Sequence, residues 1–425
     1  MKINILSNML FYKSHIRNSI FYFGGSLIQL VFAFFSQPIY AKYLSAQDFG
    51  ILGYYTSIQG FFTPLLLFGM TQYYLMNYFR QKEEENKEFL FNILAYLSLA
   101  NILISSIGFV GLMLVFKSAS VSVPFMPFSI FIFLILYFNI YTSFLLINLR
   151  IRKKAISYFI FSAIPPALNV GFGLFFVINL KMGAAGKLFG QVTTNILIGL
   201  LSLFYLRKYL KFKFNLGFIR KAFKYVIPLI GAGYAYYPIR SIDRIYLERL
   251  HNLSELGYYS IGVTAANFIS MASLALFMAF EPDVYRYVAE KSFQKLKKIA
   301  GAYLILVALM IVVFISISPY LMNFLTSGRY TRAYKYANIN AVGVFFMQVF
   351  GFLNAVIIAM KRSDYALYIN IIGGSAAILI YYLLIKQFAF NGANYAYVVV
   401  GVVLSLASIA FMNREFNKIK ITNKI

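Results

Sequence analysis

The chain of 425 residues contains no cysteine and only two histidines, His15 and His251. The absence of cysteine excludes disulfides, thiolate metal sites and cysteine nucleophiles. Both histidines fall near the predicted ends of helices, so we expect no histidine-based catalytic or metal centre, and no cofactor. Charged residues are also scarce, at 12% of the chain against roughly 25% in soluble domains. Most of the sequence is apolar instead.

Apolar residues make up 61% of the sequence and gather in runs of about 20 residues or longer. Because hydrocarbon cannot satisfy backbone polar groups, a spanning segment must be a helix or part of a closed barrel, and runs of this length exclude barrel strands. The sequence predicts an all-α polytopic membrane protein of about twelve transmembrane helices. The expected spans are 18–41, 49–78, 89–116, 125–149, 155–179, 185–206, 223–249, 256–284, 298–320, 333–360, 364–386 and 391–412.

The 39 basic residues, which give a formal net charge of +26, punctuate the apolar runs. A nucleic-acid binder presents its charge on one folded soluble face, so nucleic acid is not an expected partner. Of these residues, 28 fall in the termini and the even-numbered connections, nine in the opposite connections and two within a span. Positive charge is retained on the cytoplasmic side, which predicts that both termini lie in the cytoplasm.

An internal repeat divides the chain into two halves. The longest polar connection lies between the sixth and seventh expected spans, and we place there the boundary between two six-helix lobes, 1–215 and 216–425. An offset of 207 residues aligns Asp48-Phe49-Gly50 with Glu255-Leu256-Gly257, each at the start of a span. Because six is even, the lobes share one orientation, which predicts a parallel pseudo-repeat about an axis along the membrane normal.

Within the seventh expected span, residues 240–248 include four charged residues, Arg240, Asp243, Arg244 and Glu248. Each charge near the bilayer centre costs about 2.5–3.5 kcal/mol on insertion scales, so something must solvate this segment. At about 3.6 residues per turn, the two arginines share one helical face with Glu248 and Tyr237, and Asp243 lies beside it. We expect this face to line a water-filled cavity between the lobes.

Two interpretations of these charges stay open. Arg240 and Arg244 are candidates for binding the pyrophosphate or acidic sugars of an anionic lipid-linked substrate, because guanidinium groups offer planar, permanently charged donors. Alternatively, Asp243 neutralises one arginine and Glu248 the other, and the cluster only fixes helix packing. Tyr237, on the arginine face, is a further candidate for stacking against a sugar.

A polar stripe in the first expected span is a second candidate region. Under the repeat offset, Gln37 corresponds to Arg244, and Gln29, Ser36 and Tyr40 fall roughly on one helical face. Such a stripe suits a sugar path, which makes Gln29 and Gln37 cavity candidates. Interhelical hydrogen bonding, worth about 0.6 kcal/mol per contact in membrane bundles, explains the same stripe equally well.

The whole chain resembles the Wzx-type flippases of O-antigen and capsule repeat units, within the multidrug, oligosaccharidyl-lipid and polysaccharide exporter superfamily. The resemblance rests on twelve spans in two lobes, on residues 43–50 after the first span, and on Asp243-Arg244 followed by residues 255–260. It implies alternating access, in which a cavity accepts an undecaprenyl-pyrophosphate-linked oligosaccharide at the cytoplasmic leaflet and releases it at the outer leaflet. Only Arg240, Asp243 and Arg244 carry over as cavity candidates.

The resemblance further implies the bacterial cytoplasmic membrane as location, and membrane lipids and the lipid-linked oligosaccharide as partners. It is also compatible with a polysaccharide polymerase or other assembly proteins as partners. Two alternatives stay open. A cation-coupled multidrug exporter of the same superfamily would place a carboxylate inside a helix of the first lobe, where the sequence has none. A membrane glycosyltransferase or polymerase would need acidic residues on a substantial loop, and every connection is short. We therefore predict no enzymatic activity.

Overall fold

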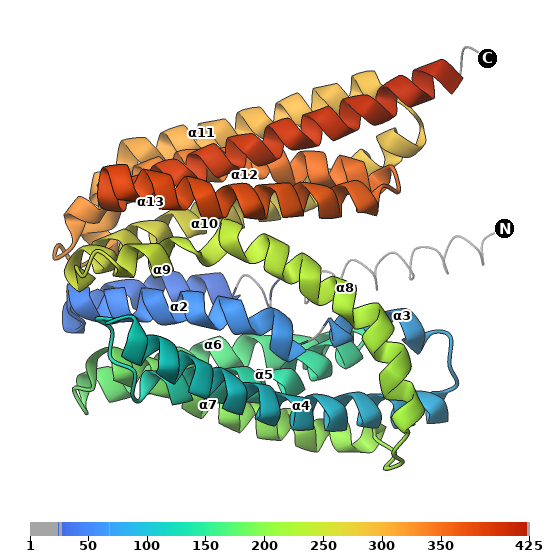
Figure 1. Cartoon of the computed structure of the whole chain (residues 1–425), viewed down its shortest axis with the longest axis horizontal. Coiled ribbons are helices and arrows are strands. Elements are labelled where there is room, and N and C mark those ends of the chain that lie inside the picture. Colours follow the sequence, from blue (N-terminus) through green and yellow to red (C-terminus); the bar gives the residue numbers. More distant parts are fainter. Residues whose placement is uncertain (1–23, 25–27, 68, 423–425) are drawn as a thin grey trace, which may run out of the picture. The chain divides into compact units, whose positions relative to one another are not determined.

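The computed structural model describes residues 24, 28–67 and 69–422, and every regular element within them is a helix. Helices satisfy their own backbone polar groups, which a bilayer requires. After a helix at 28–43, the elements are α2 (Ala46–Leu67), α3 (Met70–Tyr78), α4 (Glu83–Ser118), α5 (Phe128–Ile151), α6 (Ala155–Ile178), α7 (Gly183–Leu206), η1 (Arg207–Tyr209), α8 (Leu216–Ser241), α9 (Asp243–Glu248), α10 (Leu253–Ala289), α11 (Phe293–Leu325), η2 (Thr331–Ala333), α12 (Tyr334–Ala359) and α13 (Ser363–Thr422) (Figure 1).

Within the described residues, nine helical stretches are long and apolar enough to cross a bilayer. One of them, α13, is two helices joined at Ala389, whose φ of 49° and ψ of −129° leave the helical region. The pair α8 and α9 and the helix at 28–43 account for the rest of the predicted set of about twelve spans. The all-α polytopic prediction is confirmed. Part of the first expected span, 18–41, and both chain ends lie outside the described residues.

The helices form two compact units. The first holds the described part of Met1–Leu44 together with Ile58–Ile230, and the second holds Ser45–Ser57 together with Gly231–Ile425. Helices α2 and α8 therefore contribute residues to both units. The lobe boundary between residues 215 and 216 stays a prediction.

In the first unit, the turn between α2 and α3 is held from two sides. Gly69 adopts a left-handed conformation with φ of 59°, which glycine takes without steric cost. A Cβ at this position would come within 2.8 Å of Leu229 Cδ1, so α8 packs closely on the turn. The side-chain amide of buried Asn101 donates a 2.9 Å hydrogen bond to the Leu66 carbonyl, which satisfies an acceptor left at the end of α2.

The connection between α7 and α8 is fixed to the start of α4. The buried side chain of Asn92 donates to the Lys213 carbonyl and accepts from the Asn215 backbone N–H, both at 2.8 Å. Lys211 Nζ lies 2.8 Å from Glu88 Oε1, and this hydrogen bond raises the pKa of Lys211 above its ordinary value. The longest polar connection expected from the sequence is therefore an ordered segment of the first unit.

In the second unit, α10, α11, α12 and α13 lie side by side (Figure 1). Two consecutive glycines of α13 let α8 approach closely. A Cβ at Gly374 would clash with the Ala235 carbonyl, and a Cβ at Gly373 would come within 3.4 Å of Ile239 Cδ1. Ile239 is fully buried. This contact fixes the end of α8, immediately before the charged segment.

The starts of α2 and α10 pack against each other through the repeat motif, and this contact lies in the second unit. A Cβ at Gly257 would clash with the Ala46 carbonyl, and a Cβ at Gly50 would clash with the Leu253 carbonyl. Gly50 is equivalent to Gly257, and Ala46 to Leu253, under the 207-residue offset. The contact is therefore reciprocal, as expected where two repeats meet at a local two-fold axis. The parallel pseudo-repeat is confirmed.

Candidate functional site

The charged segment spans the end of α8 and the whole of α9. Asp243 is 5% exposed, and its Oδ2 accepts a 2.6 Å hydrogen bond from the Tyr259 hydroxyl of α10. Arg244 is 9% exposed, and its Nη1 lies 3.8 Å from Asp243 Oδ1, which is an ion-pair distance but too long for a hydrogen bond. Within the described residues, neither Asp243 Oδ1 nor Arg244 Nε has a hydrogen-bond partner. The pair therefore keeps unused polar capacity inside a buried site.

Glu248 completes the buried part of the segment. It is 1% exposed, and its Oε2 lies 4.0 Å from Nε of Arg249, whose side chain is 44% exposed. Glu248 therefore lies beside Arg249, and its pairing with Arg240 or Arg244, which one interpretation of the sequence expects, stays a prediction. In the part of the chain that the structure describes, no group of three or more candidate ligands is placed to hold a metal ion.

Arg240 differs from Arg244 in its surroundings. It is exposed, and its guanidinium carbon lies 5.9 Å from the centroid of the Tyr236 ring, within cation–π range. The expected span 223–249 runs through both α8 and α9, which are separated only at Ile242, whose φ of −74° and ψ of −22° stay helical. The two arginines of the predicted face nevertheless differ in exposure. Arg240 lies at the surface of the unit, whereas Arg244 lies inside it.

The first half of α2 packs directly against this cluster. A Cβ at Gly53 would clash with Ser260 Oγ and come within 3.3 Å of Arg244 Cδ, so only glycine fits there without movement. Gly53 and Ser260 are equivalent under the repeat offset. Tyr54, the following residue, interacts electrostatically with Glu248. In the sequence, Gly53 and Ser260 stand out only as small residues three positions after the glycine of each repeat motif. Nothing in a single sequence links them to Arg244.

The structure gathers some predicted site residues and separates others. Tyr237 of α8 is half-buried and interacts electrostatically with both Asp243 and Arg244. Gln29 and Gln37 lie in the helix at 28–43 of the first unit, where Gln29 is exposed and Gln37 is buried. A cavity shared by all of these residues stays a prediction.

Solved membrane exporters have this fold. The lipid II flippase MurJ in an inward closed conformation matches with a TM-score of 0.75 at 14% identity, over 93% of this chain and 87% of that one. An inward-facing multidrug resistance MATE transporter of the MOP superfamily matches with a TM-score of 0.67 at 10% identity, over 93% and 96%. The MATE multidrug transporter DinF-BH gives 0.64 at 15% identity, over 95% of each chain. The protein is a multi-pass membrane protein with the fold of the MOP exporters.

The family follows from the sequence itself. A family model described as "Polysaccharide biosynthesis protein" matches residues 15–282, which is more than half of the chain. The chain belongs to this family of polysaccharide biosynthesis proteins. A second model, MatE, matches residues 228–383. A search among curated proteins gives no match. The resemblance to the multidrug, oligosaccharidyl-lipid and polysaccharide exporter superfamily is confirmed.

Proposed function

We propose that the protein is a flippase that moves an undecaprenyl-pyrophosphate-linked oligosaccharide repeat unit from the cytoplasmic to the outer leaflet of the bacterial cytoplasmic membrane. The unit then serves the synthesis of a surface polysaccharide such as O-antigen or capsule. Membership of the polysaccharide biosynthesis family over residues 15–282 supports this proposal. So does the fold, which is shared with a protein named a lipid II flippase.

At the level of residues, Arg240 carries the proposal. It is exposed, and no ion pair of its guanidinium is found within the described residues, whereas the charge of buried Arg244 faces Asp243. A permanently charged planar donor that is not committed to a carboxylate suits a pyrophosphate. We assign substrate contact to Arg240, and we assign to Arg244 and Asp243 the positioning of the end of α8.

The remaining candidates fit a transport cycle of alternating access. In this proposal the lobes 1–215 and 216–425 open in turn to the cytoplasm and to the outside, with both termini in the cytoplasm. Tyr237, Gln29 and Gln37 contact the sugars along the path. No chemical step is needed, because the glycan stays attached to its lipid throughout.

Complementation in a bacterium that lacks its own repeat-unit flippase tests this function. At matched membrane expression, Arg240→Ala is expected to reduce surface glycan at least about tenfold, which corresponds to ~1.4 kcal/mol of lost interaction. Arg240→Lys keeps the charge but not the planar fork, so it should retain part of the activity. Arg286→Ala is the matched control, since Arg286 is exposed and already lies 3.0 Å from Asp283. Wild-type levels in Arg240→Ala would remove this residue from the substrate path.

A cation-coupled multidrug exporter is the second candidate. The MatE match at residues 228–383 contains Asp243 and Glu248, and buried carboxylates are groups that could bind a coupling cation. Resistance of the same strains to cationic dyes separates the two functions. Dye resistance that is lost in Asp243→Asn, together with no restored glycan, would favour the drug exporter over the flippase.

A further inference from the structure

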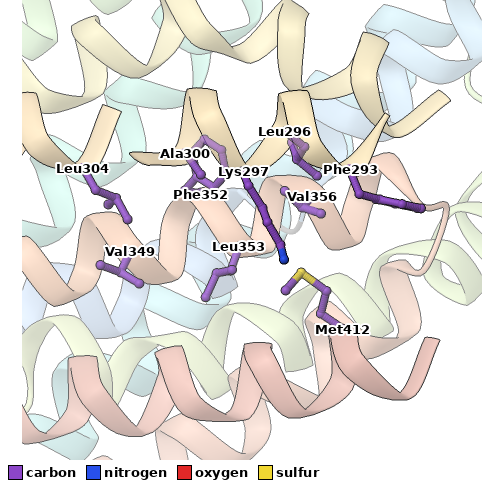
Figure 2. A pocket seen from close by; sticks show the side chains of 10 residues that line it. All are labelled: Phe293, Leu296, Lys297, Ala300, Leu304, Val349, Phe352, Leu353, Val356 and Met412. Atoms are coloured by element: carbon purple, nitrogen blue, oxygen red, sulfur yellow. The ribbon is translucent and has the colours of Figure 1, made fainter. Parts of the chain in front are cut away.

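In the second unit, α11, α12 and the end of α13 line an open pocket of about 140 Å³ (Figure 2). Apart from Lys297, every residue that lines it is apolar. Its walls include Leu296 and Leu304 of α11, Val349 and Phe352 of α12, and Met412 of α13. Pockets lined by apolar side chains take up apolar ligands. The pocket is therefore suited to hydrocarbon and not to a sugar.

The pocket is elongated along the helices. Phe293 and Leu304 line it at positions that are roughly 16 Å apart along α11, at about 1.5 Å per residue. The end at Phe293 is the start of α11, where basic residues cluster. Met412 is unbranched and flexible, so its side chain can adjust to a chain that enters. This shape matches several methylene groups of one extended acyl chain that reaches from the interface into the bilayer.

Lys297 supplies a charge at the basic end of the pocket. Figure 2 shows its amine extending from α11 toward Met412. Within the described residues it takes part in no ion pair. Glu415, three residues after Met412 in α13, is already held by Arg362 at 2.7 Å and by the Tyr365 hydroxyl at 3.0 Å. Lys297 is therefore available to an external anion.

We propose that this pocket binds one acyl chain of an anionic phospholipid from the surrounding membrane, with the lipid phosphate on Lys297. The two parts of the ligand match the two parts of the site. Hydrocarbon fills the apolar slot, and the phosphate meets the uncommitted amine at the end where membrane headgroups lie under the predicted orientation. A bound lipid joins the start of α11 to the end of α13.

The absence of tryptophan from the chain makes a direct test possible. A single tryptophan introduced by Phe293→Trp reports on the pocket in phosphatidylcholine vesicles that contain an equal fraction of dibrominated phosphatidylglycerol or dibrominated phosphatidylcholine. Bromine quenches the fluorescence of a neighbouring indole. The anionic lipid is expected to bind about fivefold more tightly than the zwitterionic one, as one lysine near the surface allows. Ile305→Trp, at a lipid-facing position that is 68% exposed, should be quenched equally by both lipids.

Charge variants in the Phe293→Trp background locate the phosphate. Lys297→Gln is expected to abolish the preference for the anionic lipid, whereas Lys298→Gln, which removes the same charge from the next position, should keep it. Equal quenching by both lipids, or equal effects of the two lysine variants, would overturn the proposal. So would displacement of the phosphatidylglycerol by added undecaprenyl phosphate at equimolar amounts, because the pocket would then belong to the glycan carrier.

Filling the pocket tests the acyl chain separately. Ala300 lines the slot, so Ala300→Phe should reduce quenching by both brominated lipids at Phe293→Trp while Ile305→Trp remains unaffected. Unchanged quenching in Ala300→Phe would show that hydrocarbon does not enter. Should that variant fail to fold, the comparison of Lys297→Gln with Lys298→Gln still decides the proposal. Neither outcome depends on which substrate the protein transports.

Discussion

The starts of α2 and α10 carry equivalent motifs, yet their acidic residues have different partners. In α2, Asp48 Oδ2 accepts hydrogen bonds from the N–H and the hydroxyl of Ser45, at 2.8 and 2.7 Å, so its carboxylate caps its own helix. In α10, Asn252 provides the cap by accepting a 3.0 Å hydrogen bond from the Glu255 N–H. The Glu255 carboxylate then binds Arg332 of η2. One acidic position thus serves a local cap in one copy and a distant contact in the other.

What the two copies share is the close approach of their backbones. The reciprocal contacts of Gly50 and Gly257 survive although the surrounding side chains differ. A backbone contact depends only on the absence of a Cβ, whereas a side-chain contact depends on what the neighbouring helices offer. The close backbone approach is therefore the feature that the two motifs share, whereas the side-chain contacts of Asp48 and Glu255 are specific to each motif.

The largest expected effect comes from adding a Cβ at this crossing. Gly257→Ala and Gly50→Ala should each lower the free energy of unfolding in detergent by about 2–3 kcal/mol, because the neighbouring atoms are backbone carbonyls that cannot rotate away. Gly351→Ala in α12 is the control, since nothing lies within 4 Å of a Cβ there, and it should be neutral or stabilising. A large loss of stability in only one of these two variants would show that the contact is not symmetric.

An intermediate effect is expected where the two copies touch through unlike residues. Gly53→Ser should cost about 2 kcal/mol, because its side chain would overlap Ser260 Oγ. Combining it with Ser260→Gly exchanges the two equivalent residues and should restore roughly half of that loss, since the crowding is mutual. Full recovery is not expected, because Arg244 also borders Gly53. Strictly additive losses in the double variant would show that the positions do not share the same space.

The smallest effects concern the two acids. Glu255→Gln should lower stability by about 1 kcal/mol and Asp48→Asn by about 0.5 kcal/mol, because the first loses a partly exposed ion pair and the second keeps a capping side chain. The two differ more clearly in salt. Raising sodium chloride to about 1 M should shrink the effect of Glu255→Gln, since the Debye length falls to about 3 Å. Identical salt responses in thermal unfolding would contradict the different roles of the two acids.

The fold was largely predictable because insertion into lipid is a property of composition. Apolar runs set the spans, and the alignment of Asp48 with Glu255 identifies the repeat from the sequence alone. Two details were not predictable. The separation of α8 from α9 falls at Ile242, where no glycine or proline marks it. The direct connection through Ala389 likewise lacks the glycine that would mark such a backbone conformation.

The candidate site was predictable only in part. The cost of charge in a membrane span singled out Arg240, Asp243 and Arg244. Periodicity could not tell the exposed arginine from the buried one, because that difference depends on packing against other helices. The hydrogen bond from Tyr259 to Asp243 joins two helices and has no spacing rule that would announce it. The sequence therefore identifies the charged residues that need partners, whereas their partners on other helices are found only in the structure.

The attachment of the connection between α7 and α8 has a practical consequence. Asn92 holds this segment through the carbonyl of Lys213 and the N–H of Asn215, and Glu88 holds it through Lys211. A cut of the chain between residues 213 and 214 would therefore leave both new ends fastened to α4. The protein is thus a candidate for co-expression as two polypeptides, 1–213 and 214–425, that assemble in the membrane. The covalent link between the two repeats would then be dispensable once the fold has formed.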